Sequence, residues 1–100
     1  MVDESYQLWA AQYLRKQIRQ LRAQIEGIRQ AEDSEYVHRA RVASRRLRAA
    51  LRMFGDCLPP KKLKDWRKAI KAVTKELGDA RDKDVQVAFL EKVLLEALAA

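Results

Sequence analysis

Glycine, proline and cysteine are scarce in this 100-residue chain, which contains three, two and one of them, respectively. So few turn-forming residues, together with abundant Leu, Ala, Arg, Lys and Gln, favour helices. The lone Cys57 excludes an intramolecular disulfide, so we expect a reducing, cytoplasmic location. The sequence shows no signal peptide and no apolar run of membrane-spanning length, so we expect a soluble protein. Its length predicts one small domain over residues 1–100.

Acidic residues are missing from the segment 36–55, which contains six arginines and one histidine. Positive charge is concentrated around this segment, because residues 34–71 hold twelve Lys or Arg against three acids. The net charge of the whole chain is +7. A field of one sign in the middle of the chain indicates a polyanionic partner.

A helix over 36–55 would separate this charge from an apolar face. At roughly 100° per residue, five basic side chains fall within a sector of about 80°; they are His38, Arg41, Arg45, Arg48 and Arg52. Like charges three or four residues apart destabilise a helix by about 0.2–0.5 kcal/mol per pair. Arginine also presents a planar fork of donors that suits phosphate oxygens. The pattern therefore favours an anion site over the alternative of an ordinary solvated face.

Apolar periodicity predicts an all-α fold, an antiparallel up-down four-helix bundle with a basic surface centred on the second helix. The first helix should span residues 5–30, with Gly27 weakening its last turn. Its predicted core stripe is Ala10, Leu14, Ile18, Leu21, Ile25 and Ile28. Residues 31–33 should connect it to the second helix, which Asp33 or Ser34 should cap.

Proline and glycine set the expected limits of the third helix. Pro60 suits its first turn and Gly78 its end, and Asp79 should then cap a fourth helix. The core residues expected in the third helix are Leu63, Trp66, Ile70, Val73 and Leu77. The fourth helix is apolar around nearly its whole circumference between residues 85 and 98, which indicates contact with a further protein surface.

Two short segments, one after the other in the chain, lie on predicted helices or at their ends. Residues 38–48 read HRARVASRRLR, and residues 77–85 read LGDARDKDV. Together they resemble the CHAD family, the conserved histidine α-helical domain, with a match over about residues 34–90. The resemblance implies a helical domain whose basic surface binds inorganic polyphosphate. It implies phosphate contacts at His38, Arg41, Arg45 and Arg48, with Arg81 as a further candidate.

Helical periodicity adds further candidate contacts for a polyphosphate chain. Arg52 continues the stripe of the second helix, and basic rows run along the first and third helices. The added residues of those two rows are Arg15, Arg19, Arg22, Lys64, Lys68, Lys71 and Lys75.

The chain carries one copy of the two-segment pattern, whereas a full-length CHAD domain resembles two four-helix halves around a shared basic groove. It would then correspond to one half, either a part of a longer domain or a short form that pairs with itself. We expect a homodimer, or contact with a second bundle, through the fourth helix.

Three other functions compete with polyphosphate binding. The same arginines would suit the phosphate backbone of a nucleic acid, although the basic sector lacks interleaved aromatic residues for base stacking. A plain helical interaction domain is a further alternative. An enzyme is not expected, because no nucleophile–base arrangement or phosphate loop occurs and Asp82 and Asp84 point to different sides of a helix. We therefore expect no catalytic residue, no metal site and no cofactor.

Overall fold

The computed structural model describes residues 4–31 and 34–99. Within these residues the chain forms four α-helices and two short 3-10 turns and has no strand. The elements are α1 (Glu4–Ala31), α2 (Ser34–Phe54), η1 (Gly55–Cys57), α3 (Pro60–Asp79), η2 (Asp82–Asp84) and α4 (Val87–Ala99). The predicted all-α class with four helices is therefore confirmed.

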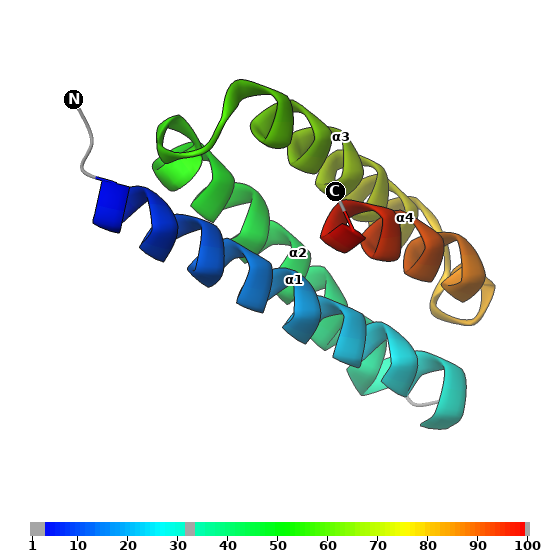
Figure 1. The fold of residues 1–100 in the computed structure, drawn as a ribbon. Helices are drawn as coiled ribbons and strands as arrows, with labels where there is room; N and C mark the ends of the chain where they lie inside the picture. Colours follow the sequence, from blue (N-terminus) through cyan, green and yellow to red (C-terminus); the bar gives the residue numbers. More distant parts are fainter. Residues whose placement is uncertain (1–3, 32–33, 100) are drawn as a thin grey trace.

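The four helices lie along a common long axis, in a body of 45 × 20 × 18 Å (Figure 1). Helix α1 packs mainly against α2 and α4, and α3 packs mainly against the same two helices. Contacts join the start of one helix to the end of the next: Tyr13 of α1 meets Phe54 of α2, and Trp66 of α3 meets Ala97 of α4. Figure 1 shows the chain reversing direction at each connection.

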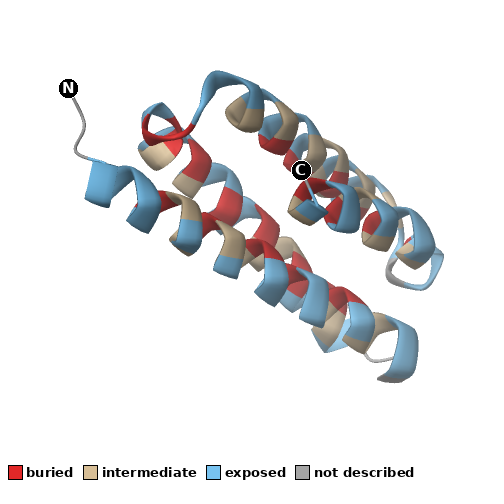
Figure 2. Ribbon diagram, viewed as in Figure 1, coloured by how far each residue is buried: buried red, intermediate tan, exposed pale blue. Residues whose placement is uncertain are grey.

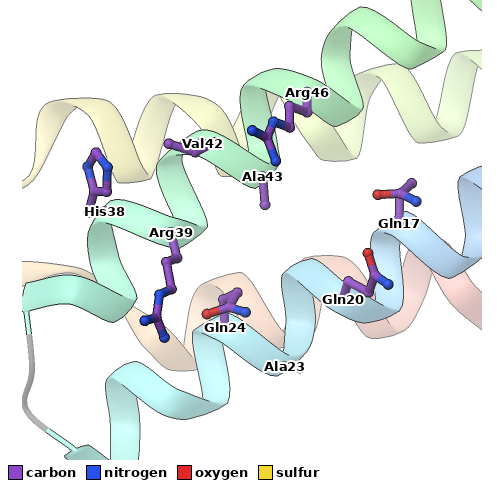
Figure 3. Close-up of a pocket in the computed structure, with 9 residues that line it drawn as sticks. All are labelled: Gln17, Gln20, Ala23, Gln24, His38, Arg39, Val42, Ala43 and Arg46. Atoms are coloured by element: carbon purple, nitrogen blue, oxygen red, sulfur yellow. The ribbon is translucent and has the colours of Figure 1, made fainter.

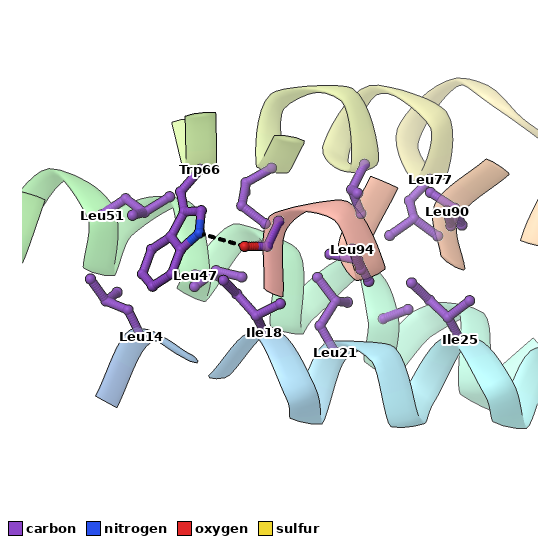
Figure 4. Packing of buried hydrophobic residues seen from close by; sticks show 14 of the residues in the cluster. Leu14, Ile18, Leu21, Ile25, Leu47, Leu51, Trp66, Leu77, Leu90 and Leu94 are labelled. Carbon is purple, nitrogen blue, oxygen red and sulfur yellow. Dashed lines mark hydrogen bonds between the residues drawn. The ribbon is translucent and has the colours of Figure 1, made fainter. Parts of the chain in front are cut away.

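A single apolar core runs between the helices, as the buried positions of Figure 2 show. The stripe predicted for α1 is buried from Ala10 to Ile25, and Ile28 packs at its edge. Trp66 is fully buried, and its indole Nε1 donates a hydrogen bond to the Ala97 carbonyl at 3.0 Å (Figure 4). Each fully buried Leu or Ile contributes about 1.5–3 kcal/mol of hydrophobic stabilisation.

Gly27 and Gly55 allow close contacts between elements. A Cβ atom at Gly27 would overlap the ring of Tyr36, so this glycine lets α2 approach α1 closely. Helix α1 continues past Gly27 to Ala31, and its last turn is intact. A Cβ at Gly55 would lie 2.8 Å from Cδ1 of Leu63.

The helix limits predicted around α2 and α3 are right in part. Helix α2 begins at Ser34, and the alternative cap Asp33 lies outside the described residues. Pro60 is in the first turn of α3, as predicted. The prediction that Asp79 caps the fourth helix is wrong. Helix α3 includes Gly78 and ends at Asp79, and η2 intervenes before α4 begins at Val87.

Aromatic side chains cover the end of the bundle where α1 begins and α2 ends. The Trp9 ring stacks on Tyr6, at a centroid distance of 5.7 Å, and on Tyr13, at 5.4 Å. Phe54 meets the Trp9 ring edge-on at 5.4 Å. Because Trp9 is still 48% exposed, the cluster leaves apolar surface in contact with water.

Helix α4 buries one face and exposes apolar side chains on another. Leu90, Leu94 and Ala97 face the core, whereas Phe89 and Leu95 are each 44% exposed. Among the residues that the structure describes, no helix combines the length and apolarity that crossing a membrane requires.

Candidate functional site

Helix α2 places most of the predicted basic stripe in solvent. His38, Arg45, Arg48 and Arg52 are exposed, and Arg41 is half-buried. Within the described residues, no ion pair involves Arg45, Arg48 or Arg52. Their mutual repulsion is therefore not relieved by an acid of the described chain.

A cavity of about 350 Å³ lies between α2 and α3, and we call it the α2/α3 cavity. Arg48 and Arg52 line it from α2, and Arg67 and Lys71 line it from α3. Two buried side chains of the core complete its lining, Leu51 and Ile70. The lining residues thus include four cations and no acid, an arrangement suited to a polyanion.

A smaller cavity of about 90 Å³ also lies between α2 and α3, lined by Arg41, Ser44, Arg45, Thr74 and Gly78. The Thr74 hydroxyl is buried and has no hydrogen-bond partner among the described residues. A Cβ atom at Gly78 would meet nothing within 4 Å. Since Arg45 and Arg48 are three residues apart on α2, the two cavities follow each other along the α2–α3 interface.

Arg41 has a different environment from the rest of the stripe. Its Nε donates a hydrogen bond to the Leu77 carbonyl at 2.6 Å, and Nη2 donates one to the Ala80 carbonyl at 3.0 Å. These carbonyls lie at the end of α3, where helical partners run out and a cation is favourable. Arg41 thereby joins the two sequence segments on which the family resemblance depends.

The basic row of α3 divides between two sides of the helix. Lys71 lines the α2/α3 cavity, and Lys64 and Lys75 are exposed on α3. Lys68 instead lines a cavity with α4. Arg81 is exposed just beyond the end of α3.

Two of the three arginines predicted on α1 lie toward α4 and not toward the α2–α3 interface. Arg15 donates from Nη1 to the Leu98 carbonyl of α4 at 2.6 Å, and its guanidinium lies 5.5 Å from the centre of the Trp66 ring. Arg22 interacts electrostatically with Glu91 of α4, and Arg19 is exposed. The structure therefore places Arg15 and Arg22 on the α4 side of α1, away from the α2–α3 interface.

Acidic groups gather on that same side of α1. A hydrogen bond between Glu26 and Glu91 lowers the pKa of Glu26 and raises the pKa of Glu91. Arg29 contacts both, with Nη2 at 2.7 Å from Oε2 of Glu91 and Nε at 3.9 Å from Oε2 of Glu26. Positive charge is therefore balanced here, in contrast to the α2/α3 cavity.

A further cavity, of about 530 Å³, lies between α1 and α2, and we call it the α1/α2 cavity (Figure 3). Its lining residues are Gln17, Gln20, Ala23, Gln24, His38, Arg39, Val42, Ala43 and Arg46. His38 is thus the one member of the predicted stripe that lines this cavity.

Sequence reasoning missed three arginines that line the α1/α2 and α2/α3 cavities. Arg39 and Arg46 fall outside the 80° sector counted along α2, although they belong to the same acid-free segment. Arg67 was missed because only lysines were counted on the third helix. Its position four residues before Lys71, on the same face, was the available signal.

Comparison with known proteins agrees with the motif analysis. No curated protein and no solved structure matches the chain. No group of three or more His, Cys, Asp or Glu residues that could hold a metal ion occurs in the described part of the chain. The family model for the CHAD domain matches residues 12–100. That match spans α2, α3, α4 and most of α1 and includes both motif segments, and the chain therefore belongs to the CHAD domain family.

Proposed function

We propose that this chain binds inorganic polyphosphate through a basic surface centred on α2, in an antiparallel up-down four-helix bundle. The observation that carries the proposal is the α2/α3 cavity, where four cations line one site without an acid. Membership of the CHAD family is consistent with polyphosphate binding. The buried, unpaired Cys57 fits the reducing, cytoplasmic setting that we propose for it.

The chemistry of binding is electrostatic. Arg48, Arg52 and Arg67 can each offer two parallel N–H donors to phosphate oxygens, and Lys71 adds a point charge. Counterions released from the polyphosphate and the relief of repulsion among the arginines both favour the complex. Arg45 extends the same surface along the α2–α3 interface.

A competition assay tests the proposal against the nucleic-acid alternative. Labelled polyphosphate bound to the chain is challenged with RNA, with duplex DNA or with unlabelled polyphosphate, at equal phosphate concentration. We expect only polyphosphate to displace the label efficiently, because the α2/α3 cavity offers no aromatic side chain for base stacking. Equal displacement by RNA or DNA would favour a nucleic-acid binder.

Charge removal tests the site itself. Arg67→Gln should weaken polyphosphate binding about tenfold, as expected for the loss of a hydrogen bond to a charged group worth about 1.5 kcal/mol. Arg19→Gln is the matched control, because it removes the same charge from an exposed position on α1 that lines neither cavity between α2 and α3. Equal losses of polyphosphate affinity in the two variants would indicate diffuse attraction by the net charge of the chain.

We also propose that the chain binds polyphosphate without cleaving it. The assay is release of orthophosphate from polyphosphate in the presence of Mg²⁺, Mn²⁺ or Zn²⁺. No release above the buffer control is expected, and release that depends on the chain would identify an enzyme.

Self-association through α3 and α4 is the second part of the proposal. A cavity of about 460 Å³ between these helices is lined by apolar groups that include the exposed Phe89 and by Asp65, Lys68 and Glu96. A two-fold axis brings the same patch of both copies together. Because the patch carries both signs of charge, Lys68 of one copy can then meet an acid of the other. We infer that a second copy of this chain covers this surface.

Light scattering coupled to size-exclusion chromatography measures the oligomeric state. We expect a dimer at micromolar concentration and a monomer for Phe89→Glu, with polyphosphate still bound. Met53→Glu is the control, since Met53 is 73% exposed and does not line the cavity. A monomeric unmodified chain would contradict the dimer.

A further inference from the structure

The α1/α2 cavity lies on the other side of α2 from the α2/α3 cavity, because α2 packs between α1 and α3. None of the residues that line one cavity lines the other. The lining of the α1/α2 cavity includes Arg39, Arg46 and His38 and, like that of the α2/α3 cavity, no acidic residue. The two flanks of α2 therefore carry charge of the same sign.

Arg46 brings an uncompensated positive charge to the α1/α2 cavity. It is exposed, and it forms no ion pair within the part of the chain that the structure describes. Arg39 has an acidic neighbour, since its Nε lies 3.5 Å from Oε1 of Glu35. Both side chains of this pair are 54% exposed, and such an exposed pair contributes at most about 1 kcal/mol. A phosphate oxygen can therefore replace Glu35 beside Arg39 at little cost.

Glutamine side chains of α1 lie across the cavity from these arginines, as Figure 3 shows. Gln17 and Gln20 can each donate amide N–H groups, and a hydrogen bond from an amide to an anionic oxygen is charge-assisted. Because glutamine carries no negative charge, it does not repel a phosphate. Both helices that bound the α1/α2 cavity thus offer donors to an anion.

The outer surface of α2 connects its two flanks. Arg45 and Arg46 are consecutive, so their side chains point about 100° apart around the helix. Arg45 lines the small cavity toward α3, and Arg46 lines the α1/α2 cavity. Val42 and Ala49, one turn before and one turn after, lie between these two directions at about 100° per residue. Neither side chain is large or acidic, so neither obstructs nor repels an anion that passes over α2.

We propose that the α1/α2 cavity is a second site for polyphosphate, and that a sufficiently long polyphosphate crosses α2 to occupy the α1/α2 and α2/α3 cavities together. This inference rests on the proposed function of polyphosphate binding. A helix with its side chains is about 10–12 Å wide, so the three phosphates of tripolyphosphate are too few to reach both cavities. Short polyphosphates therefore fill the two cavities separately. A longer one gains affinity, because its second contact is intramolecular.

Isothermal titration with tripolyphosphate counts the sites. We expect two tripolyphosphates per unmodified chain and one for either Arg46→Glu or Arg67→Glu, since each variant places an acid in one of the two cavities. Arg19→Glu is the matched control, because it makes the same change of charge at an exposed position that lines neither cavity, and it should still bind two. Circular dichroism verifies the fold of each variant.

Two results of this titration would overturn the second site. One is a single tripolyphosphate per unmodified chain, and the other is two tripolyphosphates that Arg46→Glu leaves in place. A single tripolyphosphate that only Arg67→Glu removes would leave the proposed function intact. Failure of the unmodified chain to bind polyphosphate of any length would instead refute the proposed function.

Polyphosphates of increasing defined length test the crossing of α2. In the unmodified chain, we expect affinity to rise about a hundredfold once a polyphosphate spans both cavities, as for other linked contacts. The number bound should then fall from two to one. Arg46→Glu should lose this rise, whereas Arg19→Glu should keep it. A gradual rise with length that Arg46→Glu leaves unchanged would overturn the crossing.

Discussion

Replacing Arg41 by Gln should destabilise the fold, whereas the same replacement of Arg45, four residues along α2, should not. Arg41 donates hydrogen bonds to the carbonyls of Leu77 and Ala80 at the end of α3. Arg45 is exposed and forms no ion pair within the described residues. The two changes remove the same charge from the same helix and differ in the contacts that are lost.

The expected loss for Arg41→Gln follows from those two contacts. A hydrogen bond to a charged group contributes about 1.5–3 kcal/mol, and solvent around the half-buried guanidinium favours the lower values. Two such bonds broken, with partial compensation by water, give a loss of about 2 kcal/mol. In a domain of this size, that corresponds to a fall in Tm of roughly 8–16 °C. Arg45→Gln should stabilise by about 0.2–0.5 kcal/mol per repulsive pair removed.

Urea denaturation followed by circular dichroism gives both free energies of unfolding. The capping role of Arg41 requires a loss of about 2 kcal/mol for Arg41→Gln and no loss for Arg45→Gln. A loss below about 0.5 kcal/mol for Arg41→Gln would refute the capping role, since a contribution that small is typical of an exposed surface contact. An equal loss of unfolding free energy in both variants would show that Arg41 stabilises the fold no more than Arg45 does.

Two packing contacts carry further predictions. Gly27→Ala should lower Tm, because the added Cβ would overlap the Tyr36 ring and overpacking costs about 1–3 kcal/mol. This cost outweighs the greater helix propensity of Ala, which is about 1 kcal/mol. A higher Tm would contradict the prediction. Trp66→Phe should reduce the free energy of unfolding by about 1–3 kcal/mol, since it leaves the buried Ala97 carbonyl without its donor. Urea denaturation measures that loss, and unchanged stability would show that water replaces the indole.

Much of the fold could be predicted from the sequence, because amphipathic periodicity depends on residues close together in the chain. The buried stripe of α1 and the start of α3 at Pro60 were predicted correctly on that basis. The cap expected at Asp79 was not, because α3 extends to Asp79 and η2 precedes α4. Arg41 hydrogen-bonds the end of α3 from another helix. A local rule for helix ends cannot include such a contact.

The candidate site was less predictable for a related reason. Periodicity tells which residues share one face of a helix, but the helix on which that face packs depends on the whole bundle. Arg15 was predicted to contact polyphosphate from a row on the first helix, and in the structure its guanidinium hydrogen-bonds a carbonyl of α4. Arg67 was left out, yet it lines the α2/α3 cavity with Arg48 and Lys71. Charge counts thus identified the basic helix and missed the division of its surface into two cavities.

The salt dependence of polyphosphate affinity is the direct test of polyphosphate binding in the α2/α3 cavity. Titrations at several salt concentrations give the slope of log K against log salt, which is about −0.7 per phosphate neutralised on a single-stranded polyanion. We predict a steep slope for the unmodified chain and a slope smaller by about 0.7 for Arg67→Gln and for Arg48→Gln. Arg19→Gln should leave the slope unchanged. A salt-independent affinity, or equal slopes in all four proteins, would contradict polyphosphate binding in the α2/α3 cavity.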